Sequence, residues 1–258
     1  MKILMIGDVV GSNGSSFLRK KLSALKKENG IDFVIANGEN SADGNGITLS
    51  SANFLFDSGV DIITTGNHAF RRKEIYSLFD EDKNLIRPAN FPEGAAPGNG
   101  FCIIDTLKTK ILIINLLGTI FMESLPCPFK TIDNILEKYG ESAIVIVDFH
   151  AETTSEKRAM GFYLDGRVSA VLGTHTHVAT ADECILPKGT GYVTDVGMTG
   201  PINSVLGVKP EIIIKKLTTK MPVRFDFASG DCKMDCILLE VDEKTKKAIA
   251  IERLKVNN

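Results

Sequence analysis

The amino-acid sequence predicts an α/β fold, in which short strands alternate with longer helices as far as about residue 175. Short runs of β-branched and aliphatic residues recur along this part of the chain, as in Lys2–Gly7 and Ala143–Phe149. Between these runs lie longer stretches with one apolar helical face, and this alternation is typical of strands joined by crossover helices. After residue 180 the short runs follow one another more closely, which favours antiparallel pairing there.

Each expected element follows from a local pattern of apolar residues bounded by turn residues. Strands are expected at Lys2–Gly7, Asp32–Asn37, Asp61–Thr65, Phe101–Asp105, Ile111–Leu117, Ala143–Phe149, Val168–Gly173, Gly191–Asp195, Met234–Val241 and Ala248–Leu254. Helices are expected at Ser15–Glu28, Ser50–Ser58, Lys73–Phe79, Lys130–Tyr139, Ser155–Leu164 and Pro210–Leu217. The first helix shows the pattern, because Phe17, Leu18, Leu22 and Leu25 share one face.

Two segments rich in glycine and proline, Pro88–Gly100 and Gly197–Gly207, are expected to be loops. Neither is long or polar enough to be a clear domain linker, and the chain contains no internal repeat. The chain has 258 residues, of which 43% are hydrophobic and 24% charged, a composition that excludes disorder. We therefore expect residues 1–258 to form a single domain.

Composition and charge exclude several classes of partner. Lys plus Arg number 30 and Asp plus Glu 32, so the net charge of −2 lacks the basic excess of proteins that bind long nucleic acids. No uncharged apolar run reaches the ~18 residues of a membrane span, and Ile3–Ile6 meets Gly7-Asp8 too soon for a signal peptide. Five scattered cysteines without a CxxC pair fit reduced thiols, with Cys232 and Cys236 packed in a strand. We therefore expect a cytoplasmic protein without a membrane partner.

Potential metal ligands lie at the ends of the predicted strands. The chain has four histidines, and each follows or ends a strand: His68, His150, His175 and His177. Carboxylate and amide side chains occupy the ends of the first three strands: Asp8, Glu39, Asn40 and Asn67. Loops at the carboxyl ends of strands converge in α/β proteins, so these side chains are expected to meet. Imidazole, carboxylate and amide donors suit Mn, Fe or Zn, and so many donors suit two ions about 3.5–4 Å apart.

Each of these residues also has an ordinary structural interpretation. Asp8 would serve as a helix cap, Asn67 and His68 as part of a turn, and His150 as a hydrogen-bonded core histidine. The pair His175 and His177 is more specific, because side chains at i and i+2 share a face of an extended backbone. Their joint occurrence in strand-end order favours the metal site.

The order of these residues resembles that of the calcineurin-like metallophosphoesterases. The matching series is Asp8, Asn37-Gly38-Glu39-Asn40, Gly66-Asn67-His68, His150 and Gly173-Thr174-His175-Thr176-His177. Two departures, Val10 in place of a histidine and Glu39 in place of the usual bridging aspartate, look like the bacterial YmdB branch. That narrower resemblance covers nearly the whole chain, and it includes Gly7-Asp8-Val9-Val10-Gly11, Asp148-Phe149-His150-Ala151-Glu152, Tyr163-Leu164-Asp165-Gly166-Arg167 and Asp195-Val196-Gly197-Met198-Thr199-Gly200.

The resemblance implies a four-layer αββα sandwich of two mixed sheets flanked by helices, and two divalent ions, iron or manganese with zinc as a third option. Glu39 would bridge the ions, with Asp8, Asn40 and His177 at one and Asn67, His150 and His175 at the other. The implied activity is hydrolysis of 2′,3′-cyclic nucleotides, with 3′,5′-cyclic nucleotides as an open extension. A water activated by both ions would attack phosphorus, and His68 would protonate the leaving oxygen.

Three nearby segments have two interpretations each. Met198 and Thr199 would contact substrate from a glycine-rich loop or simply belong to a turn. The segment Ala151–Ser155 begins a helix capped by Thr153 or Thr154, and secondarily would support His150. The pair Arg71-Arg72 is better explained as a solvated helix start than as a phosphate contact.

Other functions fit the same residues. A phosphomonoesterase acting on nucleotides or phosphoproteins would use the same cluster, and competing mono- and diester substrates would separate the two. A metal-containing regulatory protein with little turnover is the second alternative. A catalytic role is favoured over it, because the ligand set is complete and His68 remains available as a general acid. An RNA-processing nuclease fits poorly, because the chain has no Trp and only four Tyr for stacking. Exposed strand edges would allow a homo-oligomer, but the sequence contains no interface signal.

Overall fold

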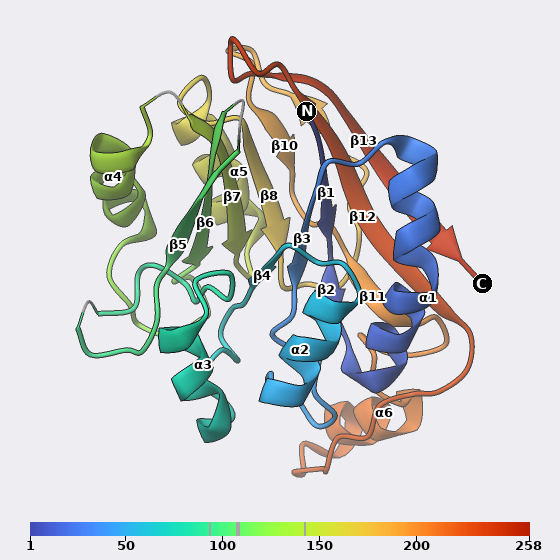
Figure 1. Ribbon diagram of the computed structural model, residues 1–258. Helices are drawn as coiled ribbons and strands as arrows, with labels where there is room; N and C mark the ends of the chain where they lie inside the picture. Colours follow the sequence, from blue (N-terminus) through green and yellow to red (C-terminus); the bar gives the residue numbers. More distant parts are fainter. Residues whose placement is uncertain (93, 107–108, 142) are drawn as a thin grey trace.

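Two mixed β-sheets lie face to face in the computed structural model, which describes residues 1–92, 94–106, 109–141 and 143–258 (Figure 1). The first sheet contains β1 (Lys2–Ile6), β2 (Asp8–Val9), β3 (Phe33–Asn37), β4 (Ile62–Thr64), β11 (Met198–Pro201), β12 (Cys232–Val241) and β13 (Ala248–Asn257). The second contains β5 (Phe101–Asp105), β6 (Lys110–Leu117), β7 (Ala143–His150), β8 (Ala170–Thr174), β9 (Cys184–Ile185) and β10 (Gly191–Val193).

The strands that carry the predicted ligands are parallel within each sheet. In the first sheet β1, β3 and β4 are parallel neighbours, with Met5 opposite Ile35 and Ile35 opposite Ile62. In the second sheet β6, β7 and β8 are parallel neighbours, with Ile146 opposite Ala170. Figure 1 shows the arrowheads of β3, β7 and β8 pointing toward the same end of the molecule. The carboxyl ends of both parallel sets therefore meet at one edge of the sandwich.

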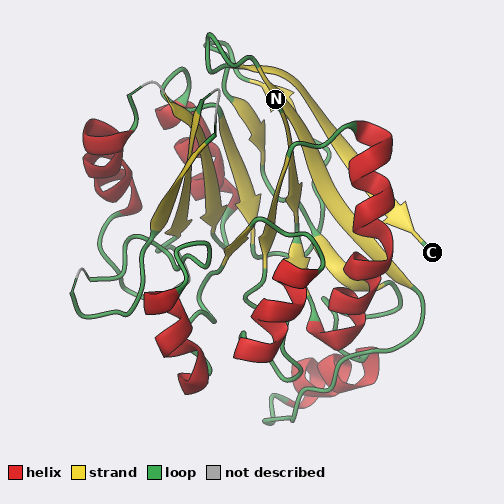
Figure 2. Cartoon of the chain, in the orientation of Figure 1, coloured by secondary structure: helices red, strands yellow, loops and turns green. Residues whose placement is uncertain are grey.

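Helices cover the outer face of each sheet and complete the four-layer αββα arrangement that the sequence predicts (Figure 2). The helices are α1 (Gly11–Asn29), α2 (Leu49–Asp57), α3 (Tyr76–Glu81), α4 (Pro128–Tyr139), α5 (Thr154–Leu164) and α6 (Pro210–Thr219), and a 3₁₀ turn at Lys73–Ile75 precedes α3. Side chains of α1 and α2 pack on the first sheet, and those of α4 and α5 on the second. Between the sheets a third cluster buries residues such as Met5, Ile35, Ile113 and Ile146.

The segment Gly197–Gly207 departs from the loop expected there. Its residues Met198–Pro201 form β11, which pairs with β2 in parallel and with β12 in antiparallel register. The preference for antiparallel pairing after residue 180 is likewise only partly right, because β10 lies parallel to β8. The expected loop Pro88–Gly100 is confirmed where it is described, whereas Glu93 lies outside the described residues. Cys232 and Cys236 are buried in β12, as expected.

No helix in the described part of the chain is long and apolar enough to cross a bilayer.

Candidate metal centre

The eight residues predicted as metal ligands or general acid meet at the common edge of the two sheets. They are Asp8, Glu39, Asn40, Asn67, His68, His150, His175 and His177, and we call them the strand-end cluster. Asp8 begins β2, and His150 is the last residue of β7. The other six lie in the loops that follow β3, β4 and β8. The parallel strands deliver these loops to one place, because their carboxyl ends coincide.

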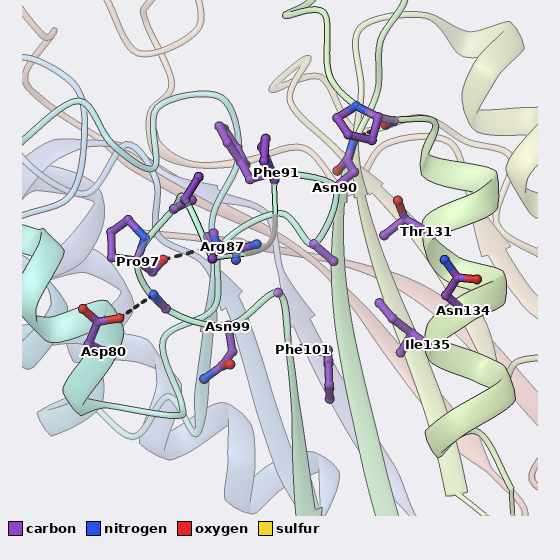
Figure 3. Close-up of a pocket in the computed structure, with 18 of the residues that line it drawn as sticks. Asp80, Arg87, Asn90, Phe91, Pro97, Asn99, Phe101, Thr131, Asn134 and Ile135 are labelled. Atoms are coloured by element: carbon purple, nitrogen blue, oxygen red, sulfur yellow. Dashed lines mark hydrogen bonds between the residues drawn. The ribbon is translucent and has the colours of Figure 1, made fainter.

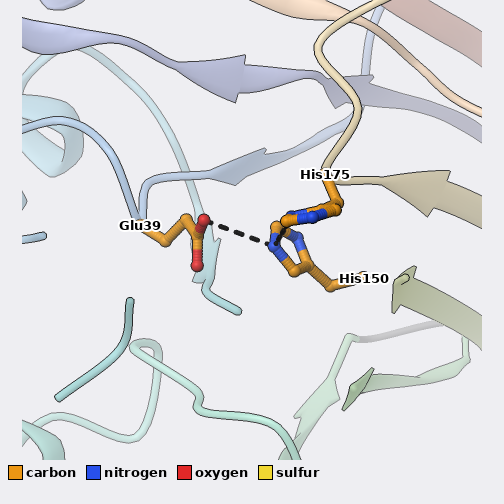
Figure 4. Close-up of side chains that lie close together, drawn as sticks. All are labelled: Glu39, His150 and His175. Atoms are coloured by element: carbon orange, nitrogen blue, oxygen red, sulfur yellow. Dashed lines mark hydrogen bonds and ion pairs between the residues drawn. The ribbon is translucent and has the colours of Figure 1, made fainter. Parts of the chain in front are cut away.

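Three side chains of the strand-end cluster have ligand atoms close enough to share one cation. Figure 4 shows the Glu39 carboxylate beside the imidazoles of His150 and His175, and these ligand atoms lie within 4.8 Å of one another. His150 Nε2 is 3.3 Å from Glu39 Oε1 and 3.0 Å from His175 Nδ1. Asn67 joins them, because its Oδ1 lies 3.0 Å from His150 Nε2. Two imidazole nitrogens, one carboxylate and one amide oxygen therefore converge.

A second group of ligand atoms adjoins the first through Glu39. His177 Nε2 lies 3.5 Å from Asp8 Oδ1, and it lies 3.4 Å from the amide nitrogen of Asn40, whose oxygen would be the ligand atom. The same Asn40 amide donates to Glu39 Oε1 at 3.0 Å. Glu39 thus touches members of both groups, which is the position a bridging carboxylate requires. The two groups together have the composition that the sequence predicts for a pair of ions.

A buried carboxylate oxygen supports the interpretation of this cluster as a cation site. Asp8 Oδ1 is fully buried and has no hydrogen-bond partner among the described residues. Buried polar atoms in proteins are nearly always paired, because an unpaired buried charge is costly. Glu39 is also buried. Two buried carboxylates surrounded by imidazoles and amides therefore fit divalent cations, one of which would complete the surroundings of the Asp8 oxygen that lacks a hydrogen bond.

The pKa shifts in the cluster follow from burial and from contacts between opposite charges. Burial raises the pKa of Glu39, but the imidazoles of His150 and His68 hold it well below its ordinary range. Burial lowers the pKa of His150, whereas the carboxylates of Glu39 and Asp8 raise it to about 9. Burial, together with the neighbouring His150, lowers the pKa of His175 to about 4. Without a metal, a proton on His150 therefore supplies the positive charge that the carboxylates favour.

The backbone after β8 differs from the extended chain that the sequence interpretation assumes. His175 has φ 102° and His177 has φ 62°, both in the left-handed region. Such a conformation costs of the order of 1–3 kcal/mol at a residue other than glycine. Both imidazoles reach the cluster, as predicted. The left-handed backbone of each residue directs them there, and not the alternation of side chains along an extended strand.

A buried hydrogen-bond chain fixes the orientation of His150. Its Nδ1 lies 2.9 Å from Thr174 Oγ1, and that hydroxyl donates to Asp148 Oδ1 at 2.7 Å. The hydroxyl gives its proton to Asp148, so it accepts the Nδ1–H of His150. This assignment leaves Nε2 free to face Glu39 and a metal. The sequence interpretation missed this role of Asp148, although its place two residues before His150 in β7 puts both side chains on one face.

Glu152 takes a different place from the one expected for its segment. The sequence predicts that residues 151–155 start a helix and only secondarily support His150, and the Glu152 carboxylate in fact lies 2.9 Å from Nε2 of His175. This contact leaves Nδ1 of His175 facing His150, on the side of the cluster. The helix start is confirmed, because Thr153 caps α5 and accepts from the backbone N–H of Glu156. Glu152 therefore orients the second imidazole of the three-residue group.

His68 lies beside the proposed ligands and remains partly open to solvent. Its side chain is 29% exposed, and its Nδ1 is 3.0 Å from Asn40 Oδ1 and 3.2 Å from Glu39 Oε1. Its backbone N–H separately donates to Glu39 Oε2 at 2.9 Å. A proton on Nδ1 is thereby held by two oxygens, so the outer Nε2 of a protonated ring has its N–H available for a substrate.

The remaining candidates lie around the cluster rather than within it. Met198 and Thr199 are buried in β11, where Met198 pairs with Asp8 and Thr199 with Val9. Arg72 donates to the backbone oxygens of Asp43 and Asn45, so it braces a loop as well as carrying charge. For Met198 and Thr199, a contact with substrate stays a prediction.

A large cavity lies apart from the strand-end cluster. Its volume is about 1230 Å³, and Figure 3 shows it between the loop around Asn90 and the helix that carries Asn134. Arg87, Phe91 and Asn99 also line it, but none of the eight cluster residues is among the described residues that do. This cavity therefore does not coincide with the candidate metal centre.

Known proteins share the sequence and the fold of this chain along its whole length. A 2′,3′-cyclic-nucleotide 2′-phosphodiesterase of Bacillus subtilis (strain 168) is 48% identical, and the match covers 100% of this chain and 98% of that protein. The crystal structure of a hypothetical protein from Thermus thermophilus has a TM-score of 0.94 at 40% identity, covering 100% and 99% of the two chains. A phosphatase structure from Mycoplasma pneumoniae has a TM-score of 0.94 at 38% identity, covering 100% of this chain and 93% of that one. Residues 4–254 match the family described as YmdB-like protein, and the chain therefore belongs to that family.

Proposed function

We propose that this protein is a phosphodiesterase that uses two divalent metal ions, iron or manganese, to hydrolyse 2′,3′-cyclic nucleotides. The observation that carries the proposal is the convergence of two buried carboxylates, two amides and three imidazoles, with Glu39 in contact with both ligand groups. The substrate class comes from the name of the Bacillus subtilis relative, which is 48% identical along the whole chain.

In this proposal the residues of the strand-end cluster divide between the two ions. Glu39 would contribute to both ions, Asp8, Asn40 and His177 would hold the first, and Asn67, His150 and His175 would hold the second. The contacts within each group support this division, because His177 Nε2 lies 3.5 Å from Asp8 Oδ1 and Asn67 Oδ1 lies 3.0 Å from His150 Nε2. When bound, the ions would supply an activated water as nucleophile and would neutralise charge on the phosphoryl oxygens.

The chain itself would supply the proton for the leaving group. A 2′-phosphodiesterase breaks the bond between phosphorus and O2′, and the departing oxygen needs a proton. The His68 side chain is exposed enough to reach a substrate, while Asn40 and Glu39 hold its inner nitrogen. Proton transfer from Nε2 to O2′ would leave a neutral imidazole, and the product would be the nucleoside 3′-phosphate. General acid catalysis of this kind contributes typically 10²–10⁴-fold in rate.

The direct test is a product assay with 2′,3′-cyclic AMP and protein loaded with Mn²⁺ or Fe²⁺. Chromatography would identify which isomer of AMP is released, and a chelator-treated sample is the control. Metal-dependent release of 3′-AMP is the expected result. Release of phosphate from AMP with no cleavage of the cyclic diester would favour a phosphomonoesterase, and no hydrolysis of either substrate would refute the catalytic proposal.

A further inference from the structure

A buried ion pair lies directly behind the histidine loop that follows β8. Lys157 of α5 and Asp195, which follows β10, are each only 1% exposed. The Lys157 Nζ lies 2.6 Å from Asp195 Oδ2. Lysine and aspartate are rarely buried so fully unless they are paired, and a buried pair is weak evidence for a stabilising role. Neither side chain contacts the described ligands of the strand-end cluster, so the proposed chemistry gives the pair no direct role.

The pair holds the two peptide groups on either side of His175. Lys157 Nζ donates to the backbone oxygen of Thr174 at 2.7 Å, and Asp195 Oδ2 accepts from the backbone N–H of Thr176 at 3.0 Å. His175 itself, at φ 102°, lies between these two anchored groups. A third contact fixes its own N–H, which donates to Asp8 Oδ2 at 3.1 Å. The left-handed conformation of His175 is therefore fixed from both sides.

The neighbouring strand β8 has a glycine where the Lys157 side chain passes. A Cβ at Gly173 would lie 3.2 Å from Lys157 Cδ and 1.8 Å from the backbone oxygen of Thr194. Glycine at this position therefore lets β8 approach both the lysine stem and the chain that leads to Asp195. The other carboxylate oxygen of Asp195 accepts from the backbone N–H of Gly197 at 2.9 Å, which holds the carboxylate in place.

We propose that Lys157 and Asp195 are positioning residues that keep His175 in its left-handed conformation and so aim its imidazole at Glu39 and His150. This inference rests on the proposed role of His175 as a metal ligand and adds the device that sets its geometry. The pair acts through the backbone, so it changes neither the number nor the type of metal ligands. Its loss should weaken binding at the ion held by His150 and His175.

The test compares metal binding with folding in a variant that has lost both charges together. Lys157→Met with Asp195→Asn leaves no unpaired buried charge, and neutral replacement of a buried pair is often tolerated. We expect the metal-free variant to keep a cooperative unfolding transition, while one of two Mn²⁺ ions binds 10- to 100-fold more weakly, as for other residues that orient ligands. Mn²⁺ titration calorimetry measures the affinity, and the visible spectrum of the Co²⁺-loaded protein reports a changed ligand geometry.

Two further variants keep the result interpretable. Lys157→Leu with Asp195→Asn also leaves no unpaired buried charge, and it replaces the first double variant if that one fails to fold. Lys233→Met with Asp235→Asn is the matched control, because Asp235 is also buried and its carboxylate contacts Met198 rather than a peptide beside a histidine. This control should bind both ions with wild-type affinity and give the wild-type Co²⁺ spectrum.

The outcomes separate this inference from the proposed function. Wild-type affinity for both ions and a wild-type Co²⁺ spectrum in either neutral double variant of Lys157 and Asp195 would overturn the positioning role and leave the metal site intact. An equal loss in the control would overturn it as well, since the effect would then be general. A wild-type protein that binds no Mn²⁺ or Co²⁺ would instead refute the proposed function.

Discussion

Replacing His68 by alanine should remove catalysis of leaving-group departure while leaving the metal centre intact. The side chain is 29% exposed, so its removal opens no buried cavity. The contact that links this residue to Glu39 Oε2 comes from the backbone N–H at 2.9 Å, and alanine preserves it. We therefore expect the His68→Ala protein to bind the same number of ions as the wild type.

The size of the loss follows from the proposed proton transfer. Removal of a general acid lowers the rate by typically 10²–10⁴-fold, which corresponds to about 3 to 5 kcal/mol in the activation barrier. The ring nitrogen that faces Asn40 and Glu39 is within 3.2 Å of both oxygens, so these contacts hold the ring in one orientation. The loss should appear in kcat rather than in KM.

A comparison of two substrates with different leaving groups tests whether His68 protonates the leaving oxygen. The ribose oxygen of a 2′,3′-cyclic nucleotide needs protonation as it leaves, whereas the nitrophenolate of bis(p-nitrophenyl) phosphate leaves without it. His68→Ala should therefore be strongly impaired on the cyclic nucleotide and nearly normal on the nitrophenyl ester. Metal content is measured on the same samples by inductively coupled plasma mass spectrometry. An equal loss on both substrates, or a loss of metal, would refute the assignment of His68 as general acid.

Three other perturbations test the surroundings of the cluster. Glu152→Ala should weaken Mn²⁺ binding by about 10-fold in calorimetry, because the half-exposed carboxylate orients His175 from 2.9 Å, and unchanged affinity would contradict this role. Metal binding should release a proton at pH 7, because the raised pKa of His150, about 9, means that its imidazole carries a proton before the metal binds. Removing that proton at pH 7 costs roughly 3 kcal/mol of the binding free energy. A binding heat that does not depend on the buffer would exclude that release. Thr174→Val should destabilise the metal-free protein by about 1–3 kcal/mol in urea unfolding, because Asp148 and His150 lose a buried partner, and a change below about 0.5 kcal/mol would contradict it.

Much of the sandwich could be predicted because its strands have strong local patterns. The strand at Phe101–Asp105 has the predicted bounds, and β3 and β7 each differ from prediction by a single residue. β11 was missed because its residues include Gly and Pro, which ordinarily mark turns. These residues form a strand because the backbone of β11 pairs with β2 on one side and with β12 on the other.

Distant contacts explain where local signals fail. Helix α1 begins at Gly11, four residues before the predicted Ser15. The reason is that Asp43, from a separate loop, accepts the backbone N–H of Ser12 at 2.9 Å and caps the first turn. A carboxylate so far along the chain gives no signal beside the helix.

The residues of the strand-end cluster could be predicted from the sequence, but the residues that orient them could not. Strand-end placement was enough to bring together Asp8, Glu39 and the four histidines, because parallel strands deliver their carboxyl ends to one edge. The proposed roles of Glu152 and Lys157 depend on how α5 and the residue before it pack against β8, and local sequence patterns do not reveal this packing. The burial of Lys157 could have been predicted, because it shares a helical face with the buried Met160 and Leu164.

The most direct test of the paired-metal site is anomalous X-ray diffraction from crystals of the protein prepared with Mn²⁺. The proposal predicts two manganese peaks about 3.5–4 Å apart, with the Glu39 carboxylate between them. His177 and Asp8 should lie beside one peak, and His150 and His175 beside the other. A single peak, or two peaks that do not share Glu39, would contradict the central claim.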